Sequence, residues 1–155
     1  MRPISTQAVF RFSHAVSLYV GALKACEDGK AAISQVGIPT FLLIGFSLEN
    51  AFAAYLIASE HPTQNDFKKH DLEKAMKACS RYGLIFSKAD SEFVIKLNPM
   101  HKDFVFRYPE KMDRVDLGEM KAAIRTTKSI LADVDLGLKI KGFDVSVLAS
   151  LLPED

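Results

Sequence analysis

Residues 39–60 read PTFLLIGFSLENAFAAYLIASE, and this stretch decides the fold. It is the longest apolar run in the chain, long enough for a helix that crosses a whole domain. Its middle nevertheless holds a carboxylate and an amide, Glu49 and Asn50. We expect the helix to begin at Pro39, because the first helical turn tolerates a missing amide, and to end near His61, which precedes a proline.

This run is also long enough to be a transmembrane helix. An acidic residue at the centre of such a helix costs about 2.5–3.5 kcal/mol on insertion, and Ser47 and Asn50 add to that cost. No cluster of basic residues flanks the run. The sequence therefore predicts a buried central helix, with Asn50 in a structural role, and no membrane partner.

Small residues and one acid lie on different faces of this helix. At 100° per residue, the small residues form a narrow seam on which another helix can approach closely: Ser47, Ala51, Ala54 and Ala58. Glu49 lies instead among Leu42, Gly45, Ala53 and Leu56. A carboxylate in such surroundings must be paired, hydrogen-bonded or protonated.

Apolar residues step by three and four in three further segments, which predicts helices over residues 6–28, 71–82 and 117–135. Asp71, or the preceding His70, can cap the helix over 71–82, and Gly83 can end it. Gly137 is expected to break the chain after the last long helix.

Two shorter helices are also expected. One is capped by Asp90 or Ser91 and ends at Asn98, before Pro99. The other covers residues 145–152, after a cap at Asp144. Between them, residues 104–108 alternate aromatic side chains with others, which indicates an extended segment lying over the core.

These elements predict an all-α fold with one domain over residues 1–155. We expect an antiparallel four- to five-helix up-and-down bundle with a short extended or irregular insertion between the third and last long helices. The apolar seams of the first and last long helices have a seven-residue period, so they are candidate surfaces for a homodimer.

Charge and cysteine content exclude some classes of protein. A net charge of +1 gives no global attraction to nucleic acid or to an acidic membrane. Residues 66–88, however, carry a local charge of +3 with histidine neutral. The candidate phosphate-binding residues of this patch are Lys68, Lys69, Lys74, Lys77 and Arg81. Cys26 and Cys79 lie at apolar helical positions and no leader sequence is evident, so we expect a reduced cytoplasmic protein with buried thiols.

Motifs for metal or cofactor binding are absent from the sequence. His14, His61 and His101 show no zinc-ligand spacing with cysteines or acids. The chain has no His-Glu-x-x-His motif, no glycine-rich phosphate loop and no GxSxG motif. We therefore expect no metal and no cofactor.

The segments SLENAFAAYLIASE and HDLEKAMKACSRYGL, with the polar gap between them, resemble the HEPN family of helical domains over residues 47–131. The resemblance implies a helical bundle, often homodimeric, with a role in RNA binding, RNA cleavage, defence or toxin–antitoxin systems. Catalytic members carry an arginine followed, after four to six residues, by a histidine. None of the six arginines of this chain has a histidine at that spacing, so the ribonuclease activity of the family is not expected.

Glu49, His70 and Arg107 are the remaining candidate site residues. His70 can contact Glu49, either to hold an imidazole for acid–base chemistry or only to neutralise the buried carboxylate. Arg107 can bind a phosphate, or it can form a salt bridge to Glu49 or another acid. The sequence favours a non-catalytic RNA- or protein-binding domain, and leaves a divergent ribonuclease using these three residues, or a regulatory subunit, as alternatives.

Overall fold

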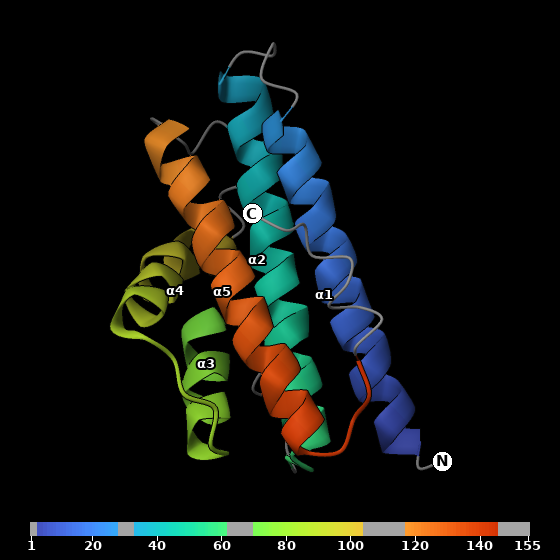
Figure 1. Ribbon diagram of the computed structural model, residues 1–155. Helices are drawn as coiled ribbons and strands as arrows, with labels where there is room; N and C mark the ends of the chain where they lie inside the picture. The colour runs from blue at the N-terminus through green and yellow to red at the C-terminus, as the bar shows by residue number, and fades with distance from the viewer. Residues whose placement is uncertain (1–2, 28–32, 62–69, 104–116, 146–155) are drawn as a thin grey trace.

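The computed structural model describes residues 3–27, 33–61, 70–103 and 117–145 (Figure 1). The regular structure of these residues is entirely α-helical, which confirms the predicted all-α bundle. The helices are α1 (Pro3–Glu27), α2 (Ile33–Ala58), α3 (Leu72–Arg81), α4 (Lys88–Lys102) and α5 (Leu117–Ile140). Lys68, Lys69, Arg107, the expected insertion and nearly all of the expected helix over 145–152 lie outside the described residues.

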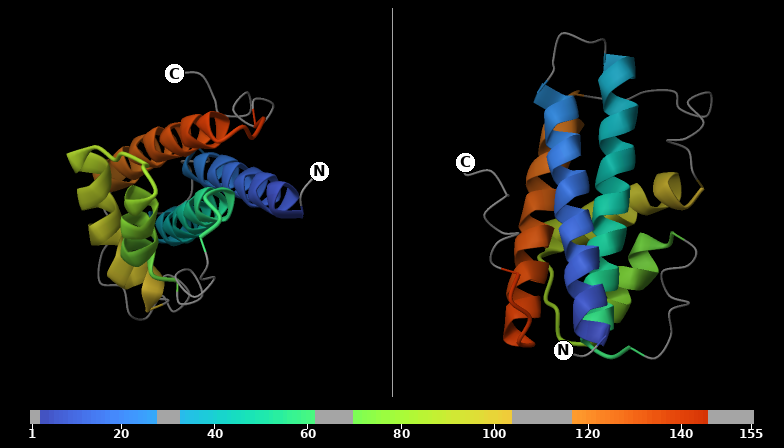
Figure 2. Two further views of the ribbon diagram at one scale, coloured as in Figure 1. Left: turned by 90° about the horizontal axis from the view of Figure 1, so that it is seen from below. Right: turned by 90° about the vertical axis from the view of Figure 1, so that its right-hand side faces the viewer.

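Three long helices and two short ones make up the arrangement. Helix α1 runs antiparallel to α2, whereas α5 runs in the same direction as α2 (Figure 1). Helices α3 and α4 pack on one side of this trio, and α4 crosses the direction of the long helices (Figure 2). Helix α2 is the central element, because it contacts each of the other four helices.

Three of the four residues of the small-residue seam of α2 are buried, and Ala58 is partly buried. Ser47, Ala51 and Ala54 have no exposed surface, and the hydroxyl of Ser47 donates a hydrogen bond of 2.7 Å to the backbone carbonyl of Ala15 in α1. The close approach that small side chains allow therefore occurs between α1 and α2.

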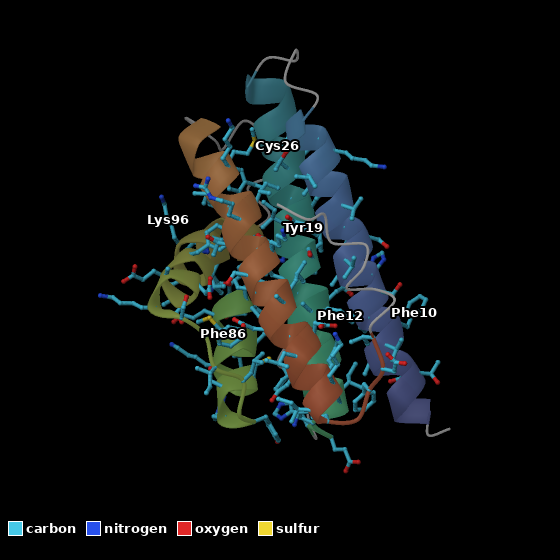
Figure 3. The ribbon with its side chains drawn as sticks, viewed as in Figure 1. Phe10, Phe12, Tyr19, Cys26, Phe86 and Lys96 are labelled. Carbon is cyan, nitrogen blue, oxygen red and sulfur yellow. The ribbon has the colours of Figure 1, made fainter. Side chains whose placement is uncertain are left out.

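Aromatic residues of α1 fill the interior of the bundle. Phe12 and Tyr19 point inward and are buried, whereas Phe10 points away from the core and is 72% exposed (Figure 3). The apolar seam of α5 is likewise buried at Met120, Leu131 and Val134. The two seams expected to be dimer surfaces thus pack mainly within the chain.

Helix α2 is long enough and apolar enough to cross a membrane. Its segment Gly37–Ala58 has a mean hydropathy of 1.7, and 72% of the most apolar window is buried inside the bundle. Such burial is what the central helix of a bundle requires, because its apolar surface is already covered by other helices.

The expected start of α2 was wrong. The helix begins at Ile33, so that Pro39 lies inside it and not at its first turn. A proline inside a helix removes one backbone hydrogen bond and its ring crowds the preceding turn. Pro39 lies only six residues after the start of α2, where few backbone hydrogen bonds of the helix can be disturbed. Helix α1 also packs along this end of α2 (Figure 1).

The bounds of α4 also differ from the expectation. Ser87 is the N-cap, its hydroxyl accepts from the backbone amide of Asp90, and the helix continues through Pro99 to Lys102. Asp90 therefore belongs to the first turn and is not the cap. The helix continues past Pro99 because the side chains of Asn98, His101 and Lys102 form hydrogen bonds to other parts of the chain.

Gly137 does not end α5, which continues to Ile140. A Cβ atom at this position would lie 2.7 Å from the ring of Tyr55, so the glycine lets α5 approach α2 closely. Gly142, two residues beyond the end of α5, has a φ of +86°, the left-handed conformation that glycine adopts readily after a helix.

Candidate functional site

Glu49 lies in the middle of α2, and a single oxygen of its side chain contacts two histidines. Nδ1 of His70 is 2.7 Å from Oε2 of Glu49, and Nε2 of His101 is 2.9 Å from the same oxygen. The contact between Glu49 and His70, which the sequence leaves open as one of two roles for His70, is therefore present. The second histidine, from α4, is a partner that the sequence did not indicate.

The position of His70 depends on an unusual backbone conformation. Its φ is +54°, a left-handed value that costs a residue with a side chain about 1–2 kcal/mol. The next residue, Asp71, is the N-cap of α3 and accepts a hydrogen bond of 3.1 Å from the amide of Lys74, as predicted. The chain thus turns sharply at His70, which directs the imidazole to α2 while α3 begins.

His101 reaches Glu49 because α4 continues beyond Pro99. Its side chain is 1% exposed, and its ring occupies the space beside Gly45, one turn before Glu49 in α2. A Cβ atom on Gly45 would lie only 2.2 Å from Nδ1 of His101. The ring of Phe46 also meets the rings of His101 and His70 edge-on, with centroids 5.1 and 5.9 Å apart.

A second set of hydrogen bonds holds the two histidine-bearing turns together. The side-chain oxygen of Asn98 accepts from the amide of Leu72 at 2.7 Å, and its amide group donates to Asp71 at 3.1 Å. The ammonium group of Lys102 lies 2.7 Å from Asp71. The neighbours of His70 and His101 in sequence are therefore bound to each other, which fixes both imidazoles relative to Glu49.

The histidines determine the ionisation of Glu49. Burial alone would raise the pKa of this carboxyl group, but hydrogen bonds from His101 and His70, together with their charges, lower the pKa below its ordinary value. The carboxylate is therefore ionised at neutral pH and can only accept hydrogen bonds. Consequently each imidazole presents an N–H group to Oε2.

The cluster of Glu49, His70 and His101 is accessible from one side. The side chains of Glu49 and His70 are 15% and 29% exposed, whereas His101 is buried. One ligand atom from each residue lies within 4.8 Å of the others, a spacing that could hold a metal ion. The arrangement could alternatively support proton transfer between a carboxylate and an imidazole.

Asn50, the other polar residue in the middle of α2, hydrogen-bonds to α1 and within its own helix. Its side-chain oxygen accepts a hydrogen bond of 2.9 Å from Arg11 of α1, and its amide group donates to the backbone carbonyl of Phe46 at 2.8 Å. The Arg11 partner was not anticipated, because the two residues lie in different helices.

Helix α3 separates its cations from its apolar residues. Lys74, Lys77 and Arg81 are exposed on one face, and the opposite face buries Leu72, Ala75, Met76, Ala78 and Cys79. Lys77 forms an ion pair of 2.6 Å with Glu73. These three cations are the described part of the predicted phosphate-binding patch.

Both cysteines are free. Cys79 is buried, and this burial raises the pKa of its thiol.

Comparison of the chain with protein-family models, curated proteins and solved structures found no match. The fold, the Glu49 cluster and the exposed face of α3 are therefore the features of the chain that bear on its function.

Replacing Gly45 by alanine should displace His101 from Glu49. In a helix this change ordinarily stabilises by about 0.5–1 kcal/mol, but here the added methyl group collides with the imidazole. We expect Gly45→Ala to lower the free energy of unfolding by about 1–3 kcal/mol, measured by urea denaturation.

Gly21→Ala is the matched control, because a Cβ atom there would only touch the side chain of Leu43 at 3.6 Å. It should leave the free energy of unfolding unchanged or raise it. Equal stability of the two variants would show that the ring of His101 does not occupy the space beside Gly45.

The lowered pKa of Glu49 also predicts a pH dependence of stability. Because its pKa in the folded state is below the unfolded value of 4.5, its contribution is present above that pH and is lost as the pH falls through the folded value. The free energy of unfolding should therefore fall between about pH 5 and 3, and it should fall less steeply in Glu49→Gln. Identical pH profiles for the two proteins would contradict this assignment.

Proposed function

We propose that this chain is a HEPN-like binding domain that lacks the ribonuclease motif of the family and binds RNA through the exposed face of α3. The observation that carries the proposal is the set of exposed cations on this helix, Lys74, Lys77 and Arg81. They lie three and four residues apart, so all three can contact one nucleic-acid backbone. Following the family resemblance, we assign the domain to the cytoplasm and to a bacterial stress, defence or toxin–antitoxin setting.

An aromatic residue beside these cations supports single-stranded RNA as the ligand. Tyr82 directly follows α3 and is 37% exposed. Its hydroxyl lies 3.1 Å from Nδ1 of His61, and the two rings meet edge-on. Unpaired bases stack on exposed aromatic rings while lysine and arginine bind the phosphates. Arg81 and Tyr82 place both kinds of group at the same end of α3.

We further propose that the domain acts as a homodimer. The apolar seams of α1 and α5 are mostly used inside the chain, so the support comes from the apolar side chains that stay exposed. Phe10 on α1 is 72% exposed, and Leu136 and Ile140 on α5 are 58% and 78% exposed. Leu136 and Ile140 are one turn apart on the same face of α5.

The homodimer proposal predicts that light scattering gives the mass of two chains. A monomeric mass at high concentration would contradict this part of the proposal.

The RNA proposal predicts that reversing one charge on α3 weakens binding. Lys74→Glu should raise the dissociation constant for a short single-stranded RNA and reduce the salt dependence of binding, because a phosphate contact is lost. Fluorescence anisotropy at several salt concentrations measures both quantities. Lys74 is exposed, so the fold should be retained.

Lys121→Glu is the control, because it makes the same change of charge at an exposed position of α5. A general electrostatic effect would weaken binding equally in both variants. Equal weakening, or no RNA binding at low salt, would remove α3 as the RNA-binding face. The latter result would favour a regulatory subunit that binds protein only.

A divergent ribonuclease is the second candidate, and the contact between Glu49 and His70 favours it. A carboxylate that holds an imidazole at 2.7 Å can orient it for general acid–base chemistry. Cleavage of the same RNA should then be abolished in His70→Asn while binding is retained. Intact RNA after prolonged incubation with the original protein would eliminate this candidate.

A further inference from the structure

We propose that Glu49, His70 and His101 form a binding site for a divalent transition-metal ion, with Zn²⁺ as the best-suited ion. This inference goes beyond RNA binding and does not depend on it. The three side chains come from α2, from the residue before the α3 cap, and from the last turn of α4. They converge although 21 and 52 residues separate Glu49 from the two histidines.

The chemistry of the three ligands fits zinc. Two imidazoles and one carboxylate are a common ligand set for catalytic zinc, with bonds of about 2.0–2.2 Å and a fourth position left open. The candidate ligand atoms already lie within 4.8 Å of one another. At hydrogen-bond distances of 2.7 and 2.9 Å, the nitrogens are slightly closer to Oε2 than a tetrahedral set with such bonds requires. An ion is therefore admitted when the ligand atoms move outward slightly and each imidazole turns an unprotonated nitrogen to the ion, by moving its proton to the other ring nitrogen or releasing it to water.

The surroundings hold the ligands in place before an ion binds. Asn98 and Lys102 both bind Asp71, so the turns that carry the two histidines cannot move independently. Gly45 leaves room for the ring of His101, and Phe46 packs against both imidazoles. Contacts that fix ligand orientation in this way are typical of metal sites, where their loss reduces affinity.

The exposure of the cluster is suited to an open coordination position. Glu49 and His70 retain some solvent access, whereas His101 is shielded from solvent. An ion could enter from the side of His70 and keep a water molecule as its fourth ligand. Zinc lowers the pKa of such a water, which makes hydroxide available near neutral pH.

The alternative is that the cluster is only a hydrogen-bonded clasp for a buried charge. The two hypotheses differ in one respect, because a cluster that only neutralises a buried charge has no affinity for a metal ion. The full chain is first stripped of metal with a chelator, and the chelator is then removed. Titration of this chain with metal ions distinguishes the two hypotheses without any RNA present.

Isothermal titration of this protein with Zn²⁺ should show saturable binding of one ion per chain, and the midpoint of thermal unfolding should rise with ion concentration. Binding of Co²⁺ in place of zinc should produce the visible absorption of a tetrahedral site. Absence of saturable Zn²⁺ binding would overturn the proposal.

His70→Asn should lose this binding and remain folded, because asparagine tolerates the left-handed backbone conformation at this position. Glu49→Gln keeps the size of the side chain and removes the anionic ligand, so it should lose binding as well. His14→Asn is the control, since it removes an exposed imidazole from α1. Binding that persists in both His70→Asn and Glu49→Gln, or that is lost in His14→Asn, would overturn the assignment.

Discussion

The carboxylate of Glu49 constrains the arrangement of α2, α3 and α4. Placing a charge in the apolar centre of a bundle costs several kcal/mol unless hydrogen bonds and opposite charge compensate for it. The compensation comes from His70 and His101, which approach the same oxygen from two directions. Each histidine adjoins a helix end that Asp71, Asn98 and Lys102 also hold in place. One acid in the central helix therefore ties the start of α3 and the end of α4 to α2.

The need for a partner at Glu49 could be predicted from sequence, and His70 was one of the two candidates for that partner. His101 was missed because nothing local connects it to Glu49, and because Pro99 was interpreted as the end of its helix. A signal for it was present in Gly45, which lies one turn before Glu49 in α2. A glycine there has a helix-weakening effect, and close approach of another side chain is a physical reason for it.

Helix capping was the most predictable local feature. Asp71 caps α3 and Gly83 adopts the left-handed conformation, because these effects depend on residues adjacent in sequence. Pro39, Pro99 and Gly137 were misleading as helix boundaries. At Pro99, the hydrogen bond between Asn98 and α3 holds the helix together. At Gly137, the ring of Tyr55 occupies the space that a side chain would need. Tertiary contacts overrode local preference there, which a single sequence does not reveal.

The shared direction of α2 and α5 has a consequence for the order of folding. Helices α1 and α2 are joined by a short connection, and the contact between Ser47 and Ala15 spans 32 residues. Helix α5 instead brings Gly137 against Tyr55, so that this contact closes a loop of roughly half the chain. Loop closure of this kind slows folding. We therefore expect the pair α1 and α2 to form first, and α5 to dock last and exchange its amide hydrogens soonest among the long helices.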